Sequence, residues 1–202
     1  QGPIGSCTAN ALCASFKIQA TDKTYEPSRL FLYYVERDAS GLIGQDGAYL
    51  DDGYNTLQNT GVCKEATWSY NINNRDIRPP TAAYTEATYA RINTWGSVTS
   101  SPSDLVTQMK NVLVVGRCIV IGIAVYQSFE SQNVTNTGMV PVPNMTTEGF
   151  LGGHAVCVLG FDDSKQSFLC INSWGTSWGT THPLHPTGTR GYFYLPYLYI
   201  NN

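Results

Sequence analysis

The sequence predicts an α+β protein in which a helical lobe, at about residues 1–102, precedes an antiparallel β lobe, at about residues 103–202. Apolar residues recur at helical spacing in the first part, whereas short runs rich in Ile, Val and aromatic residues follow in the second. The chain has 202 residues, of which 42% are hydrophobic, so it can bury a core without a partner. We expect both lobes to belong to a single domain, residues 1–202, with a site in the cleft between them.

Three helices are expected in the first lobe. The first begins after Ser6, which we expect to cap it, and its apolar face is formed by Ala9, Leu12, Cys13 and Phe16. Two further helices are predicted, over 28–38 and 50–60. Residues 63–102 contain two adjacent prolines and many Thr, Asn and Ser residues, so we expect them to link the lobes.

The second lobe is expected to open with a helix and continue as strands. Ser103 is predicted to cap the helix, which ends at Gly116. Strands are then predicted over 118–126, 155–161, 167–172 and 190–199. The second and third form a hairpin around the turn sequence DDSKQ, and residues 131–149 are expected to be a polar loop.

Charge and hydropathy exclude two classes of partner. The net charge is −3, and the 12 Lys and Arg residues are scattered along the chain, so no basic surface for nucleic acid is predicted. The longest apolar run, residues 118–126, is interrupted by Gly122 and is far shorter than the roughly 20 residues that span a bilayer. We therefore expect neither a nucleic-acid partner nor a membrane partner.

Cys7 is a candidate nucleophile because it follows Gly5 and Ser6 at the predicted start of a helix. Unpaired backbone N–H groups and the helix dipole stabilise negative charge at that position, which favours a thiolate. Taken alone, Cys7 fits a buried structural cysteine better than a nucleophile, since cysteine is among the most buried residue types.

A histidine and an asparagine on the predicted hairpin are the partners that a cysteine nucleophile needs. His154 follows two glycines at the start of one strand, and Asn172 ends the next strand. If the turn centres on Asp163, the two residues lie side by side and the amide oxygen can hold the imidazole ring. Trp174 would cover that hydrogen bond from water, although Trp174 and Trp178 also fit an ordinary aromatic core.

Together these stretches resemble the papain-like cysteine peptidases over essentially the whole chain. The family's glutamine and Gly-Ser-Cys box are matched by Gln1 and by GSC at residues 5–7, its histidine by His154 and its asparagine by Asn172. The box GSCTANA is similar to that of a branch found in bacteria and some viruses. The resemblance implies a papain-like fold with a β-barrel-like second lobe, and a protease in which Cys7, His154, Asn172 and Gln1 are catalytic.

The chain also departs from the usual family pattern. Ile4 stands where most members carry a cysteine bridged to the helical lobe, Thr8 replaces the usual Trp, and Gly153 replaces the usual Asp or Asn. None of these changes removes a catalytic group. Because family members usually carry a further stretch before the glutamine, we expect native residues upstream of Gln1.

The resemblance implies a peptide or protein substrate, an inhibitory propeptide as a further partner, a monomer, no cofactor, no metal, and a secreted, periplasmic or vacuolar setting. It places the substrate-binding positions at Gly47, Ala48, Tyr49, Leu50, Gly153, Trp174 and Trp178. His182 and His185, in the insert 181–188, have a spacing that suggests a metal, but a surface loop fits two histidines between prolines better.

Two alternatives to a protease stay open on sequence. A transpeptidase or amide-processing enzyme would use the same Cys, His and Asn residues with a different acceptor. A non-catalytic binding module of the same fold typically loses Cys or His, and here both are present. The sequence therefore favours catalysis without fixing the acceptor.

Overall fold

The computed structural model describes residues 1–200, and the chain divides into two compact units, one of residues 1–97 and one that begins at Val98. We call them the helical unit and the sheet unit. The α+β class is confirmed. The predicted division near residue 102 falls inside the sheet unit, whose first helix begins at Pro102. None of the helices in the described residues is long and apolar enough to cross a bilayer.

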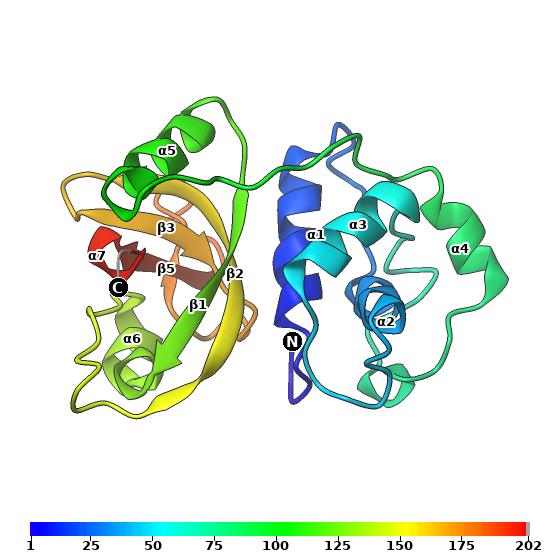
Figure 1. The fold of residues 1–202 in the computed structure, drawn as a ribbon, viewed down its shortest axis with the longest axis horizontal. Helices are drawn as coiled ribbons and strands as arrows, with labels where there is room; N and C mark the ends of the chain where they lie inside the picture. The colour runs from blue at the N-terminus through cyan, green and yellow to red at the C-terminus, as the bar shows by residue number, and fades with distance from the viewer. Residues whose placement is uncertain (201–202) are drawn as a thin grey trace. The chain divides into compact units, whose positions relative to one another are not determined.

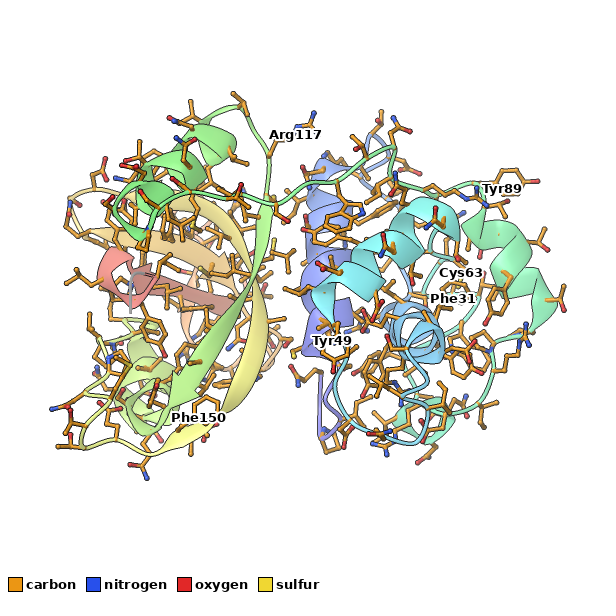
Figure 2. All side chains as sticks on the ribbon, viewed as in Figure 1. Phe31, Tyr49, Cys63, Tyr89, Arg117 and Phe150 are labelled. Atoms are coloured by element: carbon orange, nitrogen blue, oxygen red, sulfur yellow. The ribbon has the colours of Figure 1, made fainter. Side chains whose placement is uncertain are left out.

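The helical unit packs three helices on one another (Figure 1). Its elements are α1 (Cys7–Gln19), α2 (Arg29–Ala39), α3 (Leu50–Asn59), the 3₁₀ turn η1 (Ile72–Asn74) and α4 (Thr81–Ala87). Phe31 and Cys63 are fully buried within it, whereas Tyr49 and Tyr89 lie on its surface (Figure 2).

The three predicted N-terminal helices are confirmed, but one predicted cap is wrong. Ser28 caps α2, because its hydroxyl oxygen accepts from the backbone N–H of Phe31 at 3.1 Å. Ser6 makes no such bond to α1. Its hydroxyl lies instead 2.5 Å from the Tyr70 hydroxyl, a contact with a residue far along the chain.

Residues 63–102 are not merely a linker, because most of them belong to the helical unit. They contain η1 and α4, and Ala83 and Ala87 of α4 are fully buried. The alanines place one face of this short helix in the core, although the segment is rich in turn-forming residues.

The sheet unit contains a five-stranded antiparallel sheet with the strand order β1-β2-β3-β5-β4 (Figure 1). Its elements are α5 (Pro102–Val114), β1 (Ile119–Tyr126), η2 (Gln127–Glu130), α6 (Gln132–Thr137), β2 (Phe150–Asp162), β3 (Ser167–Ile171), β4 (Thr180–Thr181), β5 (Arg190–Pro196) and α7 (Tyr197–Ile200). The sheet is open and ends at β1 and β4, so it is not a closed barrel.

Several predicted boundaries in this unit need correction. The helix α5 begins before Ser103, and its N-cap residue is Ser101. The polar loop 131–149 contains the short helix α6, whose first turn is capped by Ser131. Residues 197–199, predicted as the end of a strand, belong to the helical turn α7, which follows Pro196 at the end of β5. The pattern of buried Tyr197 and Tyr199 is compatible both with a strand and with a buried helical turn.

The predicted hairpin is confirmed, but its turn is shifted. Cys157 pairs with Ile171 and Asp162 pairs with Ser167, so the turn centres after Asp163 rather than on it. An irregularity between Val158 and Gly160 shifts the register within the hairpin. Cys170 belongs to the core cluster of this unit and Cys157 does not, as expected if they occupy opposite faces of the sheet. Within residues 1–200 they are not bridged.

Candidate active site

The candidate nucleophile Cys7 is the first residue of α1 and is partly buried. The sequence before it turns sharply, because the backbone N–H of Ser6 donates to the carbonyl oxygen of Ile4 at 2.8 Å. This turn places Cys7 at the N-terminal end of a helix, where the backbone dipoles stabilise a thiolate. The predicted helix-start position of Cys7 is therefore observed.

The loop before Cys7 is tied to the segment that contains the candidate substrate-binding residues. The backbone N–H of Gly5 donates to Oδ1 of Asp46 at 3.1 Å, and that of Gly47 donates to the Tyr33 hydroxyl at 3.3 Å. A Cβ atom on Gly5 would lie 2.8 Å from the backbone nitrogen of Gly47. Glycine is therefore required at position 5 for this close approach.

Gln1 is held by contacts that the sequence did not reveal. Its side-chain Nε2 donates to the carbonyl oxygen of Ile4 at 3.2 Å, and its own carbonyl oxygen accepts from the Tyr70 hydroxyl at 2.7 Å. Because the Tyr70 hydroxyl also contacts Ser6, this one group connects both ends of the turn that precedes Cys7. Tyr70 lies in the segment predicted to be a linker, and no local pattern marks it as part of the site.

The other candidate catalytic residues are a histidine and asparagine pair in the sheet unit. His154 lies on β2 and is buried, and Asn172 directly follows β3. Nε2 of His154 lies 2.7 Å from Oδ1 of Asn172. Because the amide oxygen can only accept, Nε2 donates, and Nδ1 of the neutral imidazole is left as the basic nitrogen. The predicted contact between the two side chains is thus present in the structure.

Asn172 is itself fixed in place. Its Oδ1 also accepts from the backbone N–H of Ser173 at 2.8 Å, and its own backbone N–H donates to the carbonyl oxygen of Gly191 at 2.9 Å. These bonds hold the amide oxygen toward His154, so the imidazole ring has one defined orientation and tautomer.

Trp174 lies against the histidine ring, with ring centroids 5.1 Å apart. It also packs edge-to-face on Phe129 and Trp178, which are both buried in the core of the sheet unit. Trp174 therefore joins the His–Asn pair to a rigid aromatic cluster. Trp178 is only 6% exposed, whereas Gly153, before the histidine, is exposed.

Burial lowers the pKa of His154, and the hydrogen bond with Asn172 acts in the opposite direction. Desolvation is the larger effect, so the pKa lies below its ordinary value. Within its own unit, His154 therefore favours the neutral form, and a stable imidazolium requires an anion beside it.

Burial also sets the chemistry of three other cysteines. It raises the pKa of Cys13 and Cys170, and it raises that of Cys63 to about 12. These three side chains therefore stay thiols at neutral pH and are poor nucleophiles. Cys118 is, like Cys7, partly exposed.

The remaining candidate residues do not gather into a metal centre. In the described part of the chain, no group of three or more His, Cys, Asp or Glu side chains is arranged to hold a metal ion. The rings of His182 and His185 lie 5.7 Å apart, and that of His182 packs edge-on to Tyr192. The segment around them is largely exposed.

A cysteine at the start of a helix and a hydrogen-bonded histidine and asparagine are residue types that cysteine-dependent hydrolases use. Comparison with known proteins narrows the class: the profile described as "Papain family cysteine protease" matches residues 1–183. The chain therefore belongs to the papain family of cysteine proteases, a family of cysteine-type peptidases.

Two individual relatives come from a virus and a bacterium, as the resemblance to the bacterial and viral branch of the family predicts. The chain is 39% identical to an uncharacterized peptidase C1-like protein of Acanthamoeba polyphaga mimivirus, over 99% of this chain and 64% of that protein. It is similar to xylellain, a cysteine protease from Xylella fastidiosa, with a TM-score of 0.85 and 34% identity over 98% of this chain and 75% of that chain.

A solved structure with lower sequence identity is similar to this chain in fold alone. It is a digestive procathepsin L 3 from the larval midgut of Tenebrio molitor, with a TM-score of 0.67 and 17% identity over 100% of this chain and 60% of that chain. The present chain thus spans about two thirds of several relatives that it matches, 64% of the mimivirus protein among them.

Proposed function

We propose that the protein is a cysteine protease that hydrolyses peptide bonds, with Cys7 as nucleophile, His154 as acid and base, and Asn172 as the residue that orients His154. The observation that carries this proposal is the 2.7 Å contact between His154 and Asn172 in a chain of the papain family whose α1 begins at Cys7. The rest of the mechanism follows from the chemistry of these groups.

The resting state we propose is a thiolate and imidazolium pair. A cysteine thiol has an ordinary pKa of about 8.5, which a histidine partner and a helix N-terminus can lower by several units. Burial lowers the pKa of His154, so its positive charge is stable only beside an anion. The Cys7 thiolate is that anion, and Nδ1 is the nitrogen that carries the exchanged proton.

Acylation and deacylation then follow in two balanced steps. The Sγ anion of Cys7 attacks the peptide carbonyl carbon, and the C–N bond breaks as the His154 imidazolium donates its proton to the leaving amine. The product is a thioester on Cys7. Neutral His154 next takes a proton from water, the hydroxide attacks the thioester, and the C–S bond breaks to release a carboxylic acid and restore the thiolate.

The developing oxyanion needs fixed donors, which we assign to the side-chain amide of Gln1 and the backbone N–H of Cys7. Removal of one such donor typically lowers turnover by roughly 10²–10³. An amide nitrogen has two N–H bonds, and the contact with Ile4 uses one of them and restrains the side chain.

Substrate backbone is proposed to pair with Gly47, whose segment is tied to the loop before Cys7 through Asp46. Tyr49, which is 66% exposed, and Leu50 are proposed to line a hydrophobic pocket beside it, with Ala48 between them. Gly153, Trp174 and Trp178 are proposed as further substrate-binding residues. An inhibitory propeptide is a proposed partner, because one protein of similar fold is a procathepsin.

The decisive experiment is turnover of a panel of dipeptidyl fluorogenic substrates, with and without an epoxide inhibitor of cysteine proteases. Wild-type protein should release fluorophore, and both the inhibitor and Cys7→Ser should abolish the release. Mass spectrometry of the inhibited protein should place the adduct on Cys7.

Addition of an amine acceptor distinguishes hydrolysis from transfer. Hydrolysis predicts a free carboxylic acid as the main product, whereas a transpeptidase would yield mainly the new amide. No turnover together with no adduct on Cys7 would support a non-catalytic binding module and would overturn the proposal.

A further inference from the structure

The first turn of α1, which carries Cys7, has no cap from its own sequence. Ser6 is the N-cap residue, but its side chain makes no capping bond and instead contacts Tyr70 and Asn10. Backbone N–H groups in a first helical turn lack helical partners and need an acceptor from elsewhere. Ser6 therefore gives the first turn of α1 no side-chain cap.

The carboxyl group of Glu36, on the neighbouring helix α2, contacts this first turn through a side chain. Glu36 is fully buried, and the Thr8 hydroxyl donates to its Oε1 at 2.5 Å. The backbone N–H of Ala9 lowers the pKa of this carboxyl group as well. Thr8 directly follows Cys7 in the chain, so Glu36 holds the turn that presents the thiol.

The other carboxyl oxygen of Glu36 lies in a tight, largely apolar place between α1 and α3. Within the described residues, Oε2 has no hydrogen-bond partner. A Cβ atom on Gly53 would lie 2.6 Å from Oε2 and 2.2 Å from Cδ1 of Leu12. An ionised oxygen without donors is costly in such a place, so the neutral acid is the form that fits.

The charges around Glu36 do not reverse this preference. The pKa of Glu36 is raised to about 8, chiefly by burial, and Asp52 of α3 acts in the same direction. Arg37, on the same helix, lowers it, as do the bonds from Thr8 and Ala9. The buried thiol of Cys13 is the titratable group on α1 that interacts with the carboxyl. Burial is the largest of these effects.

We propose that Glu36 is a positioning residue for Cys7: as a neutral acid it holds the first turn of α1 through Thr8 and leaves the positive end of that helix available to the thiolate. The inference rests on the proposed role of Cys7. An ionised Glu36 would place a second negative charge against the same turn and oppose the Cys7 thiolate. Activity should therefore fall when Glu36 ionises.

Four variants separate these roles. Glu36→Gln keeps an acceptor oxygen for Thr8 but cannot ionise, whereas Glu36→Ala removes the acceptor. Thr8→Val removes the donor and leaves the acid in place. Glu26→Gln is the matched control, because Glu26 is an exposed glutamate of the same unit that pairs with Lys17.

The first measurement is the free energy of unfolding as a function of pH. An acid whose pKa is raised in the folded state binds more protons folded than unfolded, so it makes stability fall as pH rises from about 4.5 to about 8. Wild type and Glu26→Gln should show this fall in stability, whereas Glu36→Gln should lack the part of the fall that Glu36 causes. Equal slopes in wild type and Glu36→Gln would mean that Glu36 is not a buried neutral acid.

The second measurement is alkylation of Cys7 by iodoacetamide at about pH 6, where mainly a stabilised thiolate reacts. We expect Glu36→Ala and Thr8→Val to slow alkylation by roughly 10- to 100-fold and Glu36→Gln to restore most of the rate. Turnover by the variants should follow the same order as alkylation, with kcat changing more than KM. In the pH profile of activity, the alkaline limb of wild type should contain one ionisation that is absent from the profile of Glu36→Gln.

The outcomes distinguish this inference from the proposed function. If wild type does not turn over peptides, the protease proposal fails, but the alkylation rates and stability slopes still test Glu36. If Glu36→Ala does not fold, Thr8→Val and Glu36→Gln carry the test. Unchanged Cys7 alkylation in Thr8→Val and Glu36→Ala would overturn the positioning role.

Discussion

His154 and Asn172 make a 2.7 Å hydrogen bond although they are not direct partners across the hairpin. Cys157 pairs with Ile171, so continuation of that register places Asn172 opposite Val156. His154 is therefore a diagonal neighbour on the same face, within reach of an amide side chain. The pair depends on the bonds that Asn172 makes with Ser173 and Gly191, not on the strand register alone.

We expect opposite pH shifts from two substitutions of Asn172. The hydrogen bond with Asn172 raises the pKa of His154, so Asn172→Ala should lower that pKa and move the alkaline limb of kcat/KM to lower pH. Asn172→Asp adds a negative charge and should move the limb to higher pH. Turnover of Asn172→Ala should also fall by roughly 10- to 100-fold, because the ring loses its fixed orientation.

The pH profile of kcat/KM with one fluorogenic substrate measures both shifts. Shifts of the same sign in the two variants, or an unchanged profile in both, would contradict the role of Asn172 in controlling the imidazolium.

Tyr70→Phe should lower kcat with little change in KM. The lost hydroxyl connects the Gln1 carbonyl at 2.7 Å to the Ser6 hydroxyl at 2.5 Å, so the variant loosens the turn between the two proposed oxyanion donors. An oxyanion contact acts mainly in the transition state, and complete loss of one donor costs roughly 10²–10³ in turnover. The loss in Tyr70→Phe should be smaller than that limit.

Tyr25→Phe is the matched control, because its hydroxyl donates to the backbone carbonyl of Val62 elsewhere in the same unit. Equal losses of kcat in both variants would indicate general destabilisation. If Tyr70→Phe acts through Gln1, then Gln1→Ala should cost less in the Tyr70→Phe background than in wild type.

Cys7 should react with iodoacetamide at mildly acidic pH far faster than the other five cysteines. Burial raises the pKa of Cys13, Cys63 and Cys170, so these remain thiols. Cys118 is the informative comparison, because it is partly exposed like Cys7. Peptide mapping after a short exposure measures the rates, and similar labelling of Cys7 and Cys118 would argue against an activated nucleophile.

The sequence was informative where local patterns decide the structure. Helical spacing predicted α1, α2 and α3, and the run of Ile and Val predicted β1, because each buries one face of a regular element. The open sheet could not be distinguished from a barrel, since strand order and closure depend on pairings distant in sequence. The short helices α4 and α6 lie in polar, turn-rich stretches whose composition conceals them.

The same contrast holds at the candidate site. Cys7, His154 and Asn172 belong to recognisable short motifs, and the predicted His–Asn contact is present even though the turn is not centred on Asp163. Tyr70 and Glu36 were missed, because their partners lie 64 and 28 residues away along the chain. The only local signal for Glu36 is a charged residue directly after the apolar run of α2.

Gly53→Ala should destabilise the protein even though Ala is the better helix former. In an exposed helix the change would gain up to about 1 kcal/mol. At position 53 the added Cβ would lie 2.2 Å from Cδ1 of Leu12 and 2.6 Å from Oε2 of Glu36, and both neighbours are fully buried and cannot move away freely. Overpacking of this kind typically costs about 1–3 kcal/mol, so the net change should be unfavourable.

Thermal and denaturant unfolding of Gly53→Ala, with Gly96→Ala as control, measures this effect. A Cβ atom on Gly96 meets no atom within 4 Å, so that variant should unfold close to wild type. Because the new methyl group presses on Leu12 and Glu36, Gly53→Ala should also slow the alkylation of Cys7 by disturbing the first turn of α1. A stable Gly53→Ala variant with unchanged Cys7 reactivity would show that the junction of α1, α2 and α3 adapts more easily than its packing indicates.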